Sequence, residues 1–337
     1  MGAEMAGRAD WKIFQGRGEP HGGLDRLPAP PPWRFARPEC NIAPPSAHLD
    51  LEAEKGRAVP FVPTDPMILA VNTALYLRRP LLLTGKPGTG KSTLISKVAY
   101  ELKLGPVLKW PISSRSTVRS GIYEYDAVGR LQAGKGIDPP VEKYLTLGPL
   151  GTALIAQERP RALLIDEIDK SDLDFANDLL NVIEDGEFDI PELQRLGEPT
   201  VTVRDITGQA HQIHQGRIVC GQFPFVVMTS NGEREFPPPF LRRCVRLSID
   251  PPTQAELTTI VDAHLARYLD EQKRAEIDTM ITNFVSDRQQ YDISTDQLLN
   301  AIFLTVALSD QSDRKFDGKE LEAVRAALFR PLSGASQ

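Results

Sequence analysis

The chain has 337 residues, of which 41% are hydrophobic and 25% are charged, a composition typical of a globular protein with one large and one smaller domain. The formal net charge of −6 argues against DNA or RNA as the main partner, because affinity for nucleic acids depends on positive charge. Cys40, Cys220 and Cys244 share no metal-binding or redox spacing. Without a secretory signal pattern or an apolar stretch of membrane-spanning length, a cytoplasmic protein with no membrane partner is expected.

Residues 1–55 are rich in proline and glycine, which disfavour helices and inner strands. We therefore predict an extended N-terminal arm on a surface. Its aromatic residues would pin it across the main domain or a neighbouring subunit; they are Trp11, Phe14, Trp33 and Phe35.

Residues 56–250 alternate short apolar runs with helical patterns, which predicts an α/β fold, an αβα sandwich around a parallel sheet. The predicted strands are 81–84, 107–110, 162–166, 225–230 and 245–249. From Pro251 onward the strand pattern stops, and residues 251–337 are predicted to form a helical lid domain. Its four amphipathic stretches lie near 254–269, 273–286, 295–307 and 318–329.

The first predicted strand runs directly into residues 85–92, which fit the spacing G-x-x-x-x-G-K-[ST] between a strand and a helix. Glycines let backbone amides curl around a phosphate, and the helix beginning near Lys91 adds the positive end of its dipole. Lys91 is predicted to reach the β- and γ-phosphates of ATP, and Ser92 to hold Mg²⁺. The alternative is a glycine-rich turn that binds nothing. The predicted nucleotide-binding residues are Gly85, Pro87, Gly88, Thr89, Gly90, Lys91, Ser92 and Thr93.

The third predicted strand ends in two carboxylates, Asp166 and Glu167. Because parallel sheets bind ligands at the carboxyl ends of their strands, these acids are expected near the glycine-rich loop. Asp166 is predicted to bind Mg²⁺ through water, and Glu167 to orient and polarise the attacking water. The alternative for Glu167 is a solvated acid at a strand end.

Two further polar groups follow the later strands. Asn231 stands at the end of the fourth strand and is a candidate to hold the same water, although Asn231-Gly232 also fits a simple turn. Arg242 and Arg243 precede the fifth strand. Such arginines either reach the site of a neighbouring subunit, where they stabilise transition-state charge, or form an exposed basic pair.

In this order, the motifs resemble those of an AAA+ ATPase, and the similarity spans roughly residues 60–310. The run Leu147-Gly148-Pro149-Leu150, the run Asp166-Glu167-Ile168-Asp169-Lys170 and the segment Asn177 to Gly186 resemble the MoxR branch of that class. The resemblance implies the strand order 5-1-4-3-2, Asn231 as sensor 1, and Arg243 as the trans-acting finger, with Arg242 as the second candidate.

The resemblance also implies two insertions, and the sequence departs from the family pattern at one place. Residues 113–136 correspond to an insert in the second helix, and residues 188–222 to a β-hairpin before sensor 1; the alternative for both is an ordinary surface hairpin or loop. The lid of MoxR proteins usually carries a sensor 2 arginine, but the equivalent residues here, 293–298, contain none.

The resemblance implies a closed homo-oligomeric ring, a hexamer, that uses ATP and Mg²⁺ to remodel or activate a client protein. Partners with a von Willebrand factor A domain are common in this branch, and some members act in bacterial regulatory or defence systems. A slow nucleotide-gated assembly scaffold is the alternative suggested by the missing lid arginine. A nucleic-acid motor resembling the GTP-using McrB protein is disfavoured by the acidic net charge.

Overall fold

The computed structural model describes residues 11–34, 49–133, 140–156, 158–265, 268, 271–288, 291 and 293–309. The described residues fall into two compact units. The first lies within residues 1–58, 63–84 and 92–248, and the second within 59–62, 85–91 and 249–337.

The first unit is built on a sheet of five parallel strands, which confirms the predicted fold class. The strands are β1 (Leu81–Thr84), β2 (Leu108–Pro111), β5 (Ala162–Asp166), β10 (Phe225–Ser230) and β11 (Val245–Ser248). Their order, β11-β1-β10-β5-β2, is the predicted order 5-1-4-3-2. β1, β5 and β10 have the predicted bounds, whereas β2 begins and ends one residue later and β11 ends one residue earlier. All six residues of β10 are buried, as expected for an inner strand covered on both faces.

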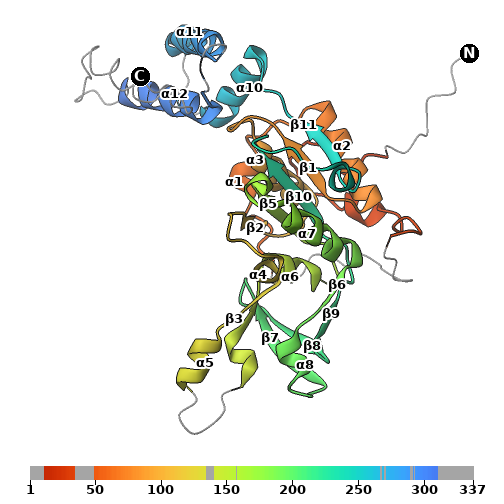
Figure 1. The fold of residues 1–337 in the computed structure, drawn as a ribbon. Helices are drawn as coiled ribbons and strands as arrows, with labels where there is room; N and C mark the ends of the chain where they lie inside the picture. Colours follow the sequence, from red (N-terminus) through yellow and green to blue (C-terminus); the bar gives the residue numbers. More distant parts are fainter. Residues whose placement is uncertain are drawn as a thin grey trace, which may run out of the picture. The chain divides into compact units, whose positions relative to one another are not determined.

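Helices flank this sheet, and Figure 1 shows them around β1, β10 and β5. The main ones are α2 (Asp65–Leu77), α3 (Lys91–Glu101), α6 (Pro149–Leu154) and α7 (Leu173–Asp185). α2 packs against β11 and β1, and α6 packs against β2 and β5. The bounds of α7 follow from its caps: Asp172 accepts a hydrogen bond from the N–H of Phe175, and Gly186 ends the helix in a left-handed conformation.

A second sheet of six short strands extends the same unit, in the order β3-β4-β7-β8-β9-β6 (Figure 1). The strands are β3 (Tyr123–Tyr125), β4 (Leu145–Leu147), β6 (Glu187–Asp189), β7 (Thr200–Asp205), β8 (Ala210–His214) and β9 (Arg217–Val219). β4 pairs with β3 of the segment 113–136 and in parallel with β7 of the segment 188–222, which joins the two predicted insertions into one sheet. The predicted hairpin before sensor 1 is formed by β7 and β8.

Short elements complete the first unit. They are η1 (Gly23–Arg26), α1 (Lys55–Ala58), α4 (Val118–Ile122), α5 (Ala127–Ala133), η2 (Val141–Tyr144), η3 (Ile168–Lys170), α8 (Pro191–Gln194) and α9 (Pro238–Leu241).

The N-terminal segment 11–34 is bound to α2 and α3 through buried polar side chains. The amide of Asn72 accepts the N–H groups of Ile13 and Phe14 and donates to the carbonyl of Phe14. The fully buried carboxylate of Glu101 accepts the N–H groups of residues 15, 16 and 18. Trp11 lies against Tyr76 and Phe14 is buried, so this part of the predicted arm contacts the domain of its own chain, whereas Trp33 is exposed. Phe35 and Cys40 lie outside the described residues.

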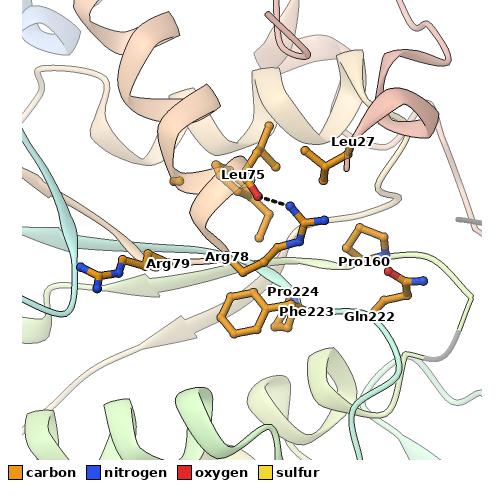
Figure 2. Close-up of a pocket in the computed structure, with 10 residues that line it drawn as sticks. Leu27, Leu75, Arg78, Arg79, Pro160, Gln222, Phe223 and Pro224 are labelled. Carbon is orange, nitrogen blue, oxygen red and sulfur yellow. Dashed lines mark hydrogen bonds between the residues drawn. The ribbon is translucent and has the colours of Figure 1, made fainter. Parts of the chain in front are cut away.

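Arg78 also holds this segment. It occupies a left-handed position at the end of α2, and its guanidinium donates to the carbonyls of Leu75 and Pro28. Figure 2 shows it beside Leu27 in a recess that is also lined by Pro160 and Phe223. The recess lies near the amino-terminal ends of β10 and β5. Asp166 and Asn231 lie at the opposite, carboxyl-terminal ends of these strands.

The second unit contains the helices α10 (Gln254–Leu265), α11 (Glu271–Asp287) and α12 (Thr295–Ser309). They share an apolar core that includes Leu257, Ile281, Phe284 and Leu298. The described residues thus show three of the four predicted lid helices, and the fourth, near 318–329, lies outside them. Over the residues that the structure describes, no helix is both long and apolar enough to cross a membrane.

Candidate functional site

The glycine-rich loop, residues 85–91, follows β1 and belongs to the second unit. Gly88 and Gly90 have φ angles of 74° and 83°. Residues with a side chain rarely adopt this left-handed backbone conformation, so the glycines of the motif are needed for the turn of the loop. The ammonium group of Lys91 donates to the loop carbonyls of Gly85 and Lys86 at 2.6 and 2.8 Å. The predicted phosphate-binding lysine therefore points into the loop.

The loop backbone is closely approached by two other segments of the second unit. A Cβ atom at Gly88 would lie 2.6 Å from the Cβ of Ser294, and one at Gly90 would lie 2.8 Å from the ring of Phe61. Real Cβ atoms do not tolerate such distances, so both positions require glycine for their packing as well as for their φ angles. Thr89 stabilises the turn by donating its hydroxyl to the carbonyl of Lys86.

Ser92 follows Lys91 in α3 and belongs to the first unit, where it meets the predicted acids. Its hydroxyl lies 3.0 Å from the Oδ1 atom of Asp166, and the hydroxyl of Thr229 lies 2.6 Å from the same oxygen. Thr93 is the next residue of α3. The structure thus brings together Ser92 at the start of α3 and Asp166 at the end of β5. A hydroxyl and a carboxylate are oxygen ligands that fit Mg²⁺.

Glu167 stands immediately after β5 in a left-handed conformation, with φ 59°. Non-glycine residues rarely adopt this backbone, and such positions occur preferentially at functional sites. The N–H of Glu167 donates to the hydroxyl of Thr229, which fixes the turn against β10. Its Oε1 atom lies 3.3 Å from the amide nitrogen of Asn231, and its Oε2 atom lies 2.5 Å from the ammonium group of Lys170. The hydrogen bond to Glu167 raises the pKa of Lys170.

Asp169, Asp172 and Asp174 lie close together in the chain, between the end of β5 and the first turn of α7. The structure assigns capping to Asp172, whereas Asp169 is buried with 4% exposure. Its Oδ2 atom accepts the N–H groups of Asn231 and Glu233, at 2.9 and 3.1 Å. Asp169 therefore connects the turn after β5 to the turn after β10.

The two candidate finger arginines differ in their surroundings. Arg243 is half-buried, with an ion pair of 3.2 Å to Glu184 and a hydrogen bond to the side chain of Asn181, both on α7. Glu184 also pairs with Arg34 of the N-terminal segment. The side chain of Arg242 is exposed, and its backbone carbonyl accepts a hydrogen bond from the guanidinium of Arg79. Of the two, Arg242 has the side chain that faces solvent.

The start of α12 occupies the place where the resemblance predicts a lid arginine. Ser294 donates to Asp296, and the side chain of Gln297 accepts the N–H of Ser294. A Cβ atom at Gly88 would lie 3.3 Å from the Oδ1 atom of Asp296, so a carboxylate stands beside the loop.

Thr229 and Asp169 belong to this constellation but were not singled out from the sequence. Both are buried polar residues, with 1% and 4% exposure, and both lie next to residues that the sequence predicts for the site. A hydroxyl as the next-to-last residue of a buried strand is the signal that points to Thr229. No local signal distinguishes Asp169 from the neighbouring capping acids, because its partners lie more than sixty residues away.

A parallel sheet in the order 5-1-4-3-2, a glycine-rich loop between its first strand and a helix, and paired acids after its third strand define a P-loop nucleoside-triphosphatase fold. Residues 80–244 match the family model of the AAA domain, dynein-related subfamily. This match and the strand order together support an AAA-type P-loop fold for this part of the chain. A comparison with curated proteins gives no match.

Proposed function

We propose that this chain binds ATP together with Mg²⁺ and hydrolyses it. The observation that carries the proposal is the cluster after β5 and β10, in which Asp166 is held by the hydroxyls of Ser92 and Thr229 while Glu167 lies against Asn231. Ser92 is joined through the chain to the glycine-rich loop that ends at Lys91. Loop, hydroxyl and paired acids are the groups that phosphoryl transfer to water requires.

Each group in the proposal has one task. The amides of residues 85–91 and the ammonium of Lys91 bind the phosphates, and Ser92 and Asp166 hold the metal ion. When bound, Mg²⁺ neutralises charge on the phosphate oxygens. Glu167 accepts a proton from the attacking water, and the Asn231 amide, 3.3 Å from that carboxylate, orients it. Positioning and charge neutralisation supply most of the catalysis in this reaction class.

Two variants test the proposal. Lys91→Met is expected to abolish ATP binding, measured with a fluorescent ATP analogue and Mg²⁺. Lys109→Met is the matched control, because Lys109 is an exposed lysine of β2 outside the loop. Glu167→Gln is expected to bind ATP like the wild type and to lose steady-state hydrolysis. Binding that does not depend on Lys91, or hydrolysis that persists in Glu167→Gln, would refute the proposal.

We further propose that the protein is a MoxR-type ATPase that works as a ring, a hexamer by resemblance, and remodels or activates a partner protein. The exposed side chain of Arg242 supports a trans-acting finger in this region. Sedimentation with ATP and Mg²⁺ in the Glu167→Gln background tests the assembly, and a species that stays monomeric contradicts it. Copurification with a protein carrying a von Willebrand factor A domain tests the partner class.

A slow nucleotide-gated scaffold is the second candidate, favoured by Asp296. A carboxylate beside Gly88, where the resemblance predicts an arginine, repels the phosphates that the loop attracts. The scaffold predicts that wild-type hydrolysis barely exceeds that of Glu167→Gln while nucleotide still controls assembly. The motor predicts a clear difference between the two rates.

A further inference from the structure

Asp169 joins the two turns that carry the proposed catalytic groups. It lies in η3, two residues after Glu167, and its carboxylate reaches the turn after β10. There it accepts the N–H of Asn231 at 2.9 Å and the N–H of Glu233 at 3.1 Å. These bonds fix the backbone from which the Asn231 side chain extends toward Glu167.

Burial makes this connection rigid. Asp169 is 4% exposed, so water does not compete effectively for the two N–H groups. A hydrogen bond to a carboxylate is stronger than one between neutral groups. Both N–H groups donate to the same oxygen, Oδ2, and the other oxygen, Oδ1, is buried without a hydrogen-bond partner among the described residues. A single carboxylate oxygen of Asp169 thus accepts both hydrogen bonds.

We propose that Asp169 is a positioning residue for ATP hydrolysis, which holds the Asn231 amide at Glu167 by binding the backbone of residues 231–233. This inference rests on the proposed ATPase function. Asp169 itself touches no reacting atom in this scheme. Its effect is therefore on the rate of the chemical step and not on nucleotide affinity, because the phosphate loop, residues 85–91, is a separate segment.

The geometry predicts which replacements preserve the function. Asparagine keeps one acceptor oxygen, and one oxygen is what the two N–H groups use. Alanine removes the acceptor, and serine is too short to reach both N–H groups. Asp169→Asn is therefore expected to hydrolyse ATP within about threefold of the wild type. Asp169→Ala and Asp169→Ser are expected to lose about tenfold to hundredfold in kcat, as misplaced catalytic groups do, with the Kd for ATP changed less than about twofold.

Asp172→Ala is the matched control. Asp172 is a nearby acid that also accepts a backbone N–H, from Phe175, but that N–H belongs to α7 and not to the turn of Asn231. Removing it weakens the helix start and is expected to leave kcat within about threefold of the wild type. A purely structural role for Asp169 predicts equal losses of kcat in Asp169→Ala and Asp172→Ala at equal losses of stability.

Amide hydrogen exchange gives a readout that does not depend on activity. In the full chain, the amides of Asn231 and Glu233 are expected to exchange faster in Asp169→Ala or Asp169→Ser and to stay protected in Asp169→Asn. If Asp169→Ala does not fold, the comparison of Asp169→Ser with Asp169→Asn tests the inference. The inference is overturned if the serine variant keeps wild-type kcat, or if the asparagine variant loses as much as the serine variant. If the wild type itself hydrolyses no ATP, the proposed function fails first, whatever the exchange shows.

Discussion

The ammonium group of Lys170 lies 2.5 Å from the Oε2 atom of Glu167, in an ion pair between residues three positions apart at the end of β5. The other carboxylate oxygen of Glu167 faces the amide of Asn231. Both oxygens of the proposed general base therefore already accept a hydrogen bond, which lowers their tendency to take a proton from water.

Removing this ion pair is predicted to raise the hydrolysis rate. In Lys170→Met, Oε2 of Glu167 is free, and because exposed ion pairs are weak the increase is about two- to fivefold. Lys55→Met is the control, since Lys55 forms a comparable exposed pair with Glu52 on a different segment. Steady-state turnover measures the effect. A fall in turnover would instead show that the ammonium group assists the reaction.

Thr229→Val is predicted to destabilise the site and to slow hydrolysis. The valine side chain has nearly the same shape but cannot accept the N–H of Glu167 or donate to Asp166. An unsatisfied buried N–H costs about 1–3 kcal/mol in the free energy of unfolding. Thr152→Val is the control: Thr152 is buried, but the hydrogen bonds of its hydroxyl to other described residues are long, 3.4 and 3.5 Å. Urea unfolding should show the larger loss for Thr229, and equal losses would contradict the prediction.

Gly88→Ala is predicted to weaken ATP binding by about tenfold or more, which corresponds to roughly 1.4 kcal/mol. The new methyl group would stand 2.6 Å from the Cβ of Ser294, so the loop and the start of α12 must separate. Gly197→Ala introduces the same left-handed strain, with φ 69°, but its Cβ would meet no atom within 4 Å. Fluorescent-nucleotide titration measures the affinity of both variants, and the Gly197 variant controls for left-handed strain outside the phosphate loop. The prediction fails if both bind ATP equally well.

Acid is predicted to open the hairpin of β7 and β8 through Asp205. Burial raises the pKa of this carboxyl, but hydrogen bonds from His211 and Thr207 outweigh burial and hold the pKa below its ordinary value of 3.8. Because the pKa of Asp205 is lower in the folded state, its ionised carboxylate stabilises the fold at pH values above the pKa of the unfolded state. That contribution is lost as pH falls from 3.8 through the lower folded-state pKa.

Amide exchange of residues 200–214 between pH 5 and pH 2 measures this loss. Asp205→Asn has no carboxyl to protonate and should show a flatter dependence on pH. The same acid transition in the variant and the wild type would assign the effect to other groups.

The two β-sheets differ in how far sequence patterns predict them. Each core strand is a short apolar run next to a turn signal, and such local patterns identify all five. Of the second sheet, only the hairpin of β7 and β8 was predicted, because the strands are three to six residues long and come from segments far apart in the chain. Pairing between Thr146 of β4 and Arg204 of β7 joins segments that no periodicity relates.

Side-chain roles show the same division. Thr229, Asp169 and Glu184 each act on a residue far away in the chain: Thr229 on Asp166, Asp169 on Asn231, and Glu184 on Arg243. The sequence places Arg242 and Arg243 side by side. Only the structure distinguishes the one tethered to α7 from the one that faces solvent.

The sequence by itself determined the sheet that carries this site and the identity of its most chemically distinctive groups. Burial of apolar runs, the spacing of the glycine loop and acids at a strand end are local constraints, and they leave a readable pattern. The tertiary structure alone decided that Asp169 binds the turn of Asn231, that Thr229 links Asp166 to Glu167, and that two insertions share one sheet. The physical reason is that a buried hydrogen bond or a strand pair depends on which distant segments meet, and the spacing of residues along the chain does not record that meeting.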